Sequence, residues 1–372
     1  MSNWNWFILA FSALSGERLL RFSRKSGTII IKIAVIVLVT FCLTELSFRI
    51  YNYFDPSFIF YSNSYNRYRG KPHSKVYDFR LNSLGFKDKE FGPKKADVYR
   101  IIGIGDSFTF GVVPYKYNYL TVLESNLKKD NYNIEILNMG IPSIGPKEYL
   151  ALFVREGLKL KPDMLLLTFY IGNDYFDCLE HEKLYEYSYV ATFINYLITI
   201  GTKYKGKIYA QGTYYDDKPT IDKKEYLEIL EHRSFIYIKG NGRLAKLDKI
   251  AFHYLSMIND ICKRRHIKFV VVIAPDEIQI SRNLQEEVIK DYYPKLKKDQ
   301  WDITQPNRLL IDELDKLGVK YINLYPYFAK KTGERLYVPQ NTHWNIAGNR
   351  LAANVIQAYM VTYLNNHISK SP

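Results

Sequence analysis

Four short polar motifs carry the residue types that acyl transfer to a serine requires. The motifs are GDSFTFG at 105–111, NMGIPSIG at 138–145, GND at 172–174 and NTHWN at 341–345. Ser107 is a candidate nucleophile, and His343 is a candidate base that would take the proton of its hydroxyl. The backbone N–H groups of Ser107 and Gly140 and the side-chain amide of Asn173 are candidate donors to the oxyanion of a tetrahedral intermediate.

The first motif fails the patterns of better-known loops with which it shares glycines. A phosphate-binding P-loop needs a lysine after its last glycine, and none follows Gly111. A dinucleotide fingerprint needs a glycine where Phe108 stands, and the hydrolase elbow G-x-S-x-G needs one where Thr109 stands. Each of the four candidate residues, taken alone, also fits an ordinary cap or turn. Their joint occurrence is what favours a catalytic site.

The elements that must position these motifs form a strand–helix repeat. Strands are predicted at 98–105, 132–140, 163–172, 267–275 and 319–328, and helices at 115–129, 146–160, 244–264, 307–317 and 346–364. Short connections imply a parallel sheet with right-handed crossovers, in which the carboxyl ends of the strands share one edge. The sequence therefore predicts an α/β fold, a three-layer α/β/α sandwich around a five-stranded parallel sheet. Residues 175–243, dense in Tyr and Lys and without a clear period, indicate an insertion or lid.

The N-terminal region indicates a membrane anchor. Residues 28–44 are apolar except for Lys32, and a helix of that length spans about 25 Å of a bilayer core of about 30 Å. Four basic residues precede it, which favours a cytoplasmic N-terminus and a domain outside the cytoplasm: Arg18, Arg21, Arg24 and Lys25. No small-x-small cleavage site follows, so an uncleaved signal anchor is favoured over a cleaved signal peptide, and a buried core helix is the other alternative.

These observations divide the chain into four parts. They are a cytoplasmic or interfacial segment at 1–27, a transmembrane anchor at 28–48, a linker and approach segment at 49–95, and a catalytic-type domain at 96–372 that includes the insertion.

Composition excludes several classes of protein. With 47% hydrophobic and 24% charged residues, the chain is not generally disordered. The formal charge of +14 is spread along the sequence without a nucleic-acid reading motif, which favours solubility or attraction to anionic lipid or glycan over nucleic-acid binding. Three distant cysteines suggest neither a zinc site nor a disulfide framework.

In this order and on these elements, the four motifs resemble the signature blocks of the SGNH hydrolases, also called the GDSL esterase/lipase family. GDSFTFG is similar to the first block, NMG to the second, YIGND to the third and HWN to the last, and NSLGFKDKE at 82–90 is similar to the lead-in of membrane-anchored bacterial members. The resemblance covers residues 80–365. It implies a flavodoxin-like sheet in the order 2-1-3-4-5, hydrolysis of small acyl esters through an acyl-serine, catalytic roles for the four candidate residues, and no metal or organic cofactor.

One position departs from the family. Members usually carry Asp three residues before the histidine, where Gln340 stands here, followed by Asn341. A neutral amide can hold an imidazole tautomer but gives no full charge to the imidazolium. Three other acidic residues are candidates for that role: Asp106, Asp174 and Glu334.

Three functions therefore remain open at this stage. The first is a membrane-anchored extracytoplasmic serine esterase acting on an acyl-ester substrate. The second is an O-acetyltransferase or deacetylase acting on envelope polysaccharide, since the Tyr-rich insertion suits an acylated glycan. The third is a catalytically degenerate module that binds a glycan or a partner, although no specific protein partner is inferred.

Overall fold

The computed structural model describes residues 4–55, 57–61, 64–178, 184–199, 212–331 and 333–367. The chain divides into two compact units. One is made of Met1–Pro56 with Leu184–Thr199, and the other of Ser57–Lys183 with Ile200–Pro372. The second unit holds the sheet and all four polar motifs.

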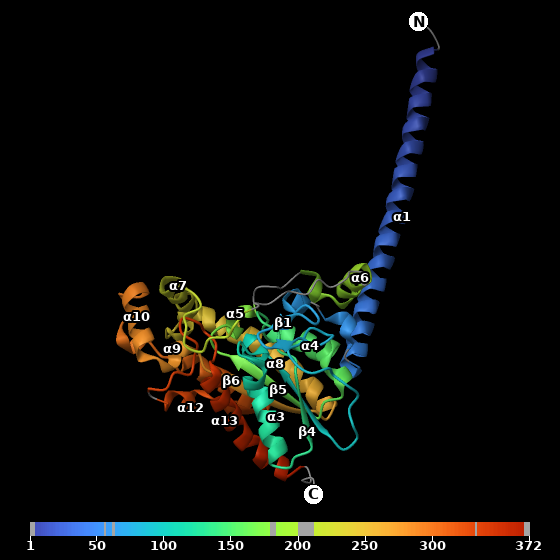
Figure 1. Ribbon diagram of the computed structural model, residues 1–372. Coiled ribbons are helices and arrows are strands. Elements are labelled where there is room, and N and C mark those ends of the chain that lie inside the picture. Colours follow the sequence, from blue (N-terminus) through green and yellow to red (C-terminus); the bar gives the residue numbers. More distant parts are fainter. Residues whose placement is uncertain are drawn as a thin grey trace. The chain divides into compact units, whose positions relative to one another are not determined.

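A five-stranded parallel sheet forms the centre of the second unit (Figure 1). Its strands are β3 (Tyr99–Ile104), β4 (Ile134–Asn138), β5 (Met164–Tyr170), β6 (Lys268–Ala274) and β7 (Lys320–Asn323). The spatial order is β4-β3-β5-β6-β7, with every neighbouring pair parallel. This is the order 2-1-3-4-5, and the predicted fold class is confirmed.

Helices cover both faces of this sheet. The helices α3 (Tyr119–Lys129) and α13 (Ile346–Asn365) pack on one face, and α4 (Pro146–Arg155), α8 (Gly242–Arg264) and α11 (Gln305–Leu317) pack on the other. Successive strand residues enter opposite cores because their side chains alternate. Ile101 belongs to the first core and Ile102 to the second, for example. All seven residues of β5 are buried, as expected for a strand covered on both faces.

The remaining elements of this unit are short helices, 3-10 turns and one hairpin. They are η1 (Phe58–Phe60), η2 (Ser64–Tyr68), β1 (Lys75–Val76), β2 (Phe79–Arg80), α2 (Ser107–Phe110), η3 (Tyr115–Tyr117), η4 (Gly157–Leu160), α5 (Asp174–Asp177), α7 (Lys223–Ser234), η6 (Phe235–Tyr237), α9 (Glu277–Ile280), α10 (Arg282–Tyr292), η7 (Lys298–Gln300) and α12 (Tyr325–Ala329). The insertion thus contains regular structure, including α7.

Two predicted elements differ from the structure at polar or proline positions. The strand expected at 319–328 ends at Asn323, and α12 follows with Pro326 in its first turn, where proline is tolerated. The helix expected at 115–129 is interrupted at Asn118, whose side chain accepts a hydrogen bond from the Leu120 N–H and caps α3.

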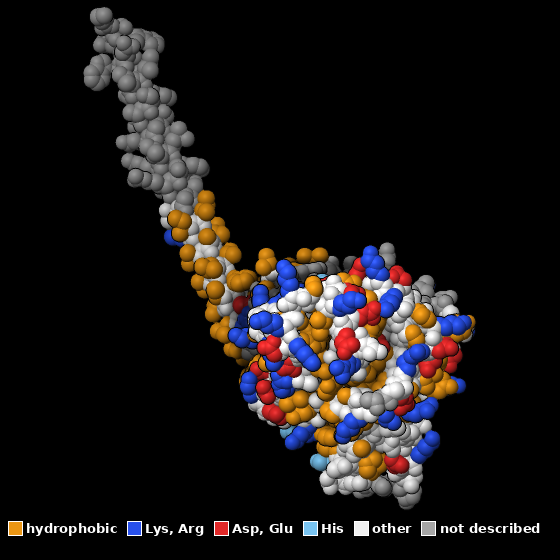
Figure 2. Space-filling view, turned by 90° about the vertical axis from the view of Figure 1, so that its left-hand side faces the viewer, with side chains coloured by type: hydrophobic (Ala, Val, Ile, Leu, Met, Phe, Trp, Pro, Cys, Tyr) orange, Lys and Arg blue, Asp and Glu red, His pale blue; other side chains and the backbone are white. Residues whose placement is uncertain are grey.

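The first unit consists of one long helix and a short apolar one. The helix α1 (Trp4–Phe54) contains the segment Thr28–Phe54, the one stretch of the described chain long and apolar enough to cross a membrane. An 18-residue window of this segment has a mean hydropathy of 2.5 and no buried residue. The second element, α6 (Tyr189–Thr199), follows η5 (Leu184–Tyr187) and packs on α1. Figure 2 shows apolar side chains covering the described part of α1, whereas Lys, Arg, Asp and Glu are interspersed over the visible face of the other unit.

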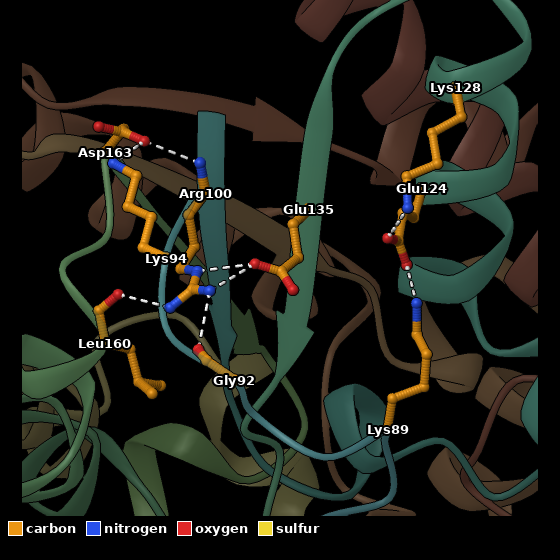
Figure 3. Close-up of polar contacts among 9 residues, drawn as sticks. All are labelled: Lys89, Gly92, Lys94, Arg100, Glu124, Lys128, Glu135, Leu160 and Asp163. Carbon is orange, nitrogen blue, oxygen red and sulfur yellow. Dashed lines mark hydrogen bonds and ion pairs between the residues drawn. The ribbon is translucent and has the colours of Figure 1, made fainter. Parts of the chain in front are cut away.

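A buried arginine fixes the start of β3 (Figure 3). Arg100 is 1% exposed, and its guanidinium pairs with Glu135 while donating to the carbonyls of Leu160 (2.9 Å) and Gly92 (3.0 Å). Its backbone N–H donates to Asp163 Oδ2 at 2.7 Å. These bonds tie the approach segment and the loop before β5 to the edge of the sheet opposite the polar motifs.

Candidate active site

Ser107 and His343 form a hydrogen-bonded pair at the carboxyl edge of the sheet. Ser107 is the first residue of α2, three residues after the end of β3, and His343 lies in the loop that leads into α13. Ser107 Oγ and His343 Nε2 are 2.7 Å apart. The fold therefore places a hydroxyl within direct proton-transfer distance of an imidazole, although 236 residues separate them in sequence.

Asn341 sets the tautomer of this imidazole. Its Oδ1 lies 2.6 Å from His343 Nδ1 and also accepts the backbone N–H of His343 at 3.0 Å. Because a backbone N–H can only donate, the amide atom facing His343 is the oxygen, and Nδ1 must carry the proton. The lone pair of the neutral ring then lies on Nε2 and faces the hydroxyl of Ser107.

A threonine from the insertion fixes the orientation of this amide. Asn341 Nδ2 donates to Thr220 Oγ1 at 2.8 Å, and the Thr220 hydroxyl donates to the backbone carbonyl of Gln340 at 3.1 Å. The hydroxyl proton is thus already used, so Thr220 can only accept from Asn341. A flipped amide would place its NH2 group against the two N–H groups of His343 and its oxygen against the oxygen of Thr220, so donors would face donors and an acceptor would face an acceptor.

The residue beside the imidazole is Asn341, two positions before the histidine, and not Gln340, three positions before it. The backbone of Gln340 has a φ of 47°, and its carbonyl accepts the hydroxyl of Thr220. Among the described residues, none of the three acidic candidates contacts His343. Asp106 caps α2, Asp174 accepts the backbone N–H of Tyr170, and Glu334 pairs with a surface lysine.

The environment of His343 keeps its ring neutral. Burial, and after it the nearby positive charge of Arg233, together lower the pKa of His343 to about 4. The ring of Phe108 lies 5.3 Å from the imidazole, centroid to centroid, and contributes to this apolar surrounding. At neutral pH, the base is therefore unprotonated and available to the serine.

Two of the three predicted oxyanion donors lie at the cavity. The N–H of Ser107 is in the first turn of α2, where helix N–H groups have no intrahelical acceptor. Asn173 also lines the cavity, near Asp106, whose pKa burial raises to about 6 against the lowering effects of the Phe108 N–H and the Asn173 amide. A primary amide has two N–H donors, so one remains for a ligand.

Gly140 lies behind the site and does not line the cavity. Its N–H donates to Asn138 Oδ1 at 2.9 Å. A Cβ on Gly140 would lie 2.2 Å from the backbone nitrogen of Phe110, so the glycine lets the loop after β4 approach α2. This close approach is sufficient to explain why position 140 is a glycine. The role of its N–H as an oxyanion donor stays a prediction.

The pair opens into a cavity of about 280 Å³. Its lining comes from the hairpin β1–β2, from α2 and the loops after the strands, and from α7: Val76, Tyr77, Ser107, Phe110, Val112, Pro142, Ser143, Tyr170, Asn173, Arg233, Thr342 and His343. Arg233 was not foreseen from the sequence, because it lies in the insertion and no motif marks it. The same holds for Thr220.

Comparisons with known proteins find similar folds but no close relative. No family model matches this chain, and no curated protein matches it. An acetyl xylan esterase, AlAXEase, is 14% identical with a TM-score of 0.40, covering 70% of this chain and 98% of its own. A lipase/acylhydrolase from Enterococcus faecalis is 13% identical with a TM-score of 0.39, covering 73% and 98%. A putative lipolytic protein of the G-D-S-L family from Desulfitobacterium hafniense DCB-2 is 12% identical with a TM-score of 0.36, covering 70% and 98%. Similarity at this level concerns the fold and not the reaction.

Proposed function

We propose that this chain is a membrane-anchored serine esterase that hydrolyses small acyl esters through an acyl-serine intermediate. The observation that carries the proposal is the hydrogen-bonded row from Ser107 Oγ to His343 Nε2, and from His343 Nδ1 to Asn341, beside an open cavity. An isolated capping serine would need neither an oriented imidazole nor a cavity beside it.

In the first half-reaction, Ser107 Oγ attacks the ester carbonyl carbon while its proton passes to His343 Nε2. The carbonyl oxygen becomes an oxyanion within reach of the Ser107 N–H and the free Asn173 N–H, each such donor typically contributing about 3–4 kcal/mol to the transition state. The imidazolium then gives its proton to the leaving alcohol as the ester C–O bond breaks. The acyl group remains on Ser107 as a new ester.

The second half-reaction repeats these steps with water. His343 Nε2 takes a proton from a water molecule, whose oxygen attacks the acyl carbon. Collapse of the second tetrahedral intermediate returns the proton to Ser107 Oγ and releases the carboxylic acid. The atoms and protons of the two half-reactions balance with the ester, water and this chain's own residues alone.

The proposed location is a membrane, crossed once, with the catalytic unit outside the cytoplasm. Support comes from the apolar stretch Thr28–Phe54 of α1 and from the basic residues that precede it in sequence.

The test is a covalent labelling and turnover experiment on the full chain in detergent micelles. A fluorophosphonate should form an Oγ–P bond at Ser107 with loss of fluoride, and peptide mass spectrometry should locate the adduct there. The same protein should hydrolyse p-nitrophenyl acetate, and Ser107→Ala should lose both the adduct and the turnover while keeping its thermal unfolding transition. Turnover that survives Ser107→Ala would overturn the proposal.

A further inference from the structure

The cavity beside Ser107 contains a cation that the ester-hydrolysis chemistry does not use. Arg233, near the C-terminal end of α7, lines this cavity. Among the described residues, its guanidinium makes one long hydrogen bond, 3.5 Å from Nη1 to the Tyr170 hydroxyl, and no ion pair. A guanidinium has five N–H donors in a planar fork, so most of them are unused.

The neighbouring acids do not take up these donors. Asp276 accepts the hydroxyls of Tyr170 at 2.9 Å and Tyr237 at 3.3 Å, and Asp106 accepts the N–H of Phe108. Burial by itself lowers the pKa of Arg233, but the surrounding oxygen groups outweigh that effect and raise it, so the guanidinium stays charged. Nearby oxygen groups thus stabilise the charge of Arg233 electrostatically, while most of its N–H donors remain open to the cavity.

Arg233 is partly buried and lies over the ring of Tyr170, and a partly buried cation without an ion-pair partner is less favourable than one whose surroundings a ligand completes. A carboxylate matches the guanidinium fork with two parallel hydrogen bonds, and such charge-assisted pairs are stronger than neutral ones. Both partners of this pair would lie in a cavity of about 280 Å³ that also contains the nucleophile. The anionic group must therefore belong to the same small molecule as the ester.

We propose that Arg233 selects esters that carry a carboxylate a few bonds from the scissile carbonyl. This inference rests on the proposed esterase function and names its substrate class. The carboxylate can stand on the acyl side, as in a dicarboxylic half-ester, or on the alcohol side, as in an acylated hydroxy acid or uronic acid. Both sources present the same charge to Arg233.

The test compares isosteric ester pairs on the full chain in a neutral detergent. Phenyl hydrogen succinate is paired with phenyl succinamate for the acyl side, and 4-acetoxybenzoate with 4-acetoxybenzamide for the alcohol side. The measured quantity is the ratio of kcat/KM within each pair, in which general effects of a substitution cancel. The native protein should favour the charged member of at least one pair about ten- to a hundredfold.

The variants are Arg233→Met and Arg233→Lys, with Arg243→Met as the matched control. Arg243 is an exposed arginine of α8 that packs over the rings of Phe176 and Phe235 and does not line the cavity. Arg233→Met should bring the ratio close to one, Arg233→Lys should keep part of it, and Arg243→Met should leave it unchanged. A native ratio near one for both pairs, or a ratio that survives Arg233→Met, would overturn the inference.

Absence of turnover on all four esters would count against the esterase proposal, and binding then decides the inference separately. In the Ser107→Ala background, calorimetric titration should show tighter binding of the charged member than of its amide, and Arg233→Met should abolish the difference. Equal binding of both members in that background would reject a carboxylate site at Arg233.

Discussion

At the scale of single residues, the base of this site is held by an amide instead of a carboxylate. Asn341 fixes the same tautomer and ring orientation that an aspartate would fix, since its oxygen faces both N–H groups of His343. It adds no charge to stabilise the imidazolium that forms during each proton transfer. With Arg233 nearby, the site has the geometry of a serine–histidine pair but a weak base.

Replacing this amide by a carboxylate should strengthen the base. Asn341→Asp would place a negative charge against Nδ1, and an adjacent opposite charge typically shifts a pKa by about 1–3 units, here upward for His343. We expect kcat/KM on p-nitrophenyl acetate to rise about tenfold, as Brønsted behaviour for general-base catalysis suggests. Gln340→Asp is the matched control, because the Gln340 side chain does not contact the imidazole. A larger gain in kcat/KM from Gln340→Asp than from Asn341→Asp would contradict the assignment of Asn341 as the residue that orients His343.

The pH profile should report the lowered pKa of the base. His343 must be unprotonated to accept the serine proton, so kcat/KM should fall as pH decreases through about 4. An ordinary histidine would place that limb near pH 6.5. Arg233→Met removes a charge that disfavours the imidazolium and should move the limb to higher pH. A limb near pH 6 in the native protein would instead point to Asp106, whose pKa burial raises to about 6. Because Arg233 lowers the pKa of Asp106 as well, the position of the limb in the native protein, and not its shift in Arg233→Met, distinguishes the two groups.

The fold brings together two of the residues that the sequence singled out, Ser107 and His343, and their catalytic roles stay predictions. Their contact could be anticipated because Ser107 follows β3 and His343 precedes α13, and both loops were expected at the carboxyl edge of the sheet. The sequence drew attention to Asn341 as the residue after Gln340. Its position against His343 Nδ1 could not be predicted, because it depends on the loop conformation around Gln340. Arg233 and Thr220 come from the insertion, whose path is set by tertiary packing and carries no local periodicity.

At the scale of elements, the site depends on close backbone approach between the loop after β4 and α2. Gly140→Ala would place a Cβ 2.2 Å from the Phe110 nitrogen, and backbone cannot move aside as a flexible side chain would. We expect a loss of about 1–3 kcal/mol in the free energy of unfolding, the usual range for overpacking. Chemical denaturation of the full chain in detergent measures it.

Gly92→Ala is the control for this substitution, because a Cβ there would meet nothing within 4 Å. An equal loss of stability in both variants would remove the steric explanation. A Gly140→Ala protein with native stability but strongly reduced kcat would instead favour the oxyanion role predicted for its N–H.

The strands β5 and β6 were predictable because each is a nearly continuous apolar run between turn residues, the pattern of a strand covered on both faces. The edge strands β4 and β7 contain polar residues and were predicted from their place in the strand–helix repeat. The errors occur where a polar or proline residue changes the local structure, as at Asn118 and after Asn323. Apolar runs place strands well, but they do not reveal where a strand passes into a short helix such as α12.

At the scale of the whole molecule, the insertion contributes residues to both units. Its helix α6 belongs to the unit of α1, whereas Thr220 and Arg233 belong to the unit of the sheet and complete the candidate site. The anchor predicted at 28–48 is part of a helix that continues to Phe54. Sequence alone gave no reason to associate part of the insertion with the anchor.

The contact that joins α6 to α1 is a helix cap supplied from another helix. Glu45 of α1 accepts the backbone N–H groups of Tyr189 and Val190, at 3.0 and 2.9 Å, and the hydroxyl of Ser188. A carboxylate there satisfies N–H groups that have no intrahelical partner and complements the positive end of the helix dipole.

Glu45→Ala should therefore loosen α6 while leaving α1 intact. Loss of a cap typically costs about 0.5–2 kcal/mol, so amide hydrogen exchange in Tyr189–Thr199 should accelerate by roughly 2- to 30-fold for the full chain in micelles. Thr44→Ala is the matched control, because the Thr44 hydroxyl donates to the Thr40 carbonyl within α1. Unchanged exchange in Glu45→Ala, or equal acceleration in both variants, would show that the cap does not hold α6 on α1. The packing of Phe48 on Phe193 and the contacts of Arg49 and Asn52 with Tyr189 would then account for the attachment.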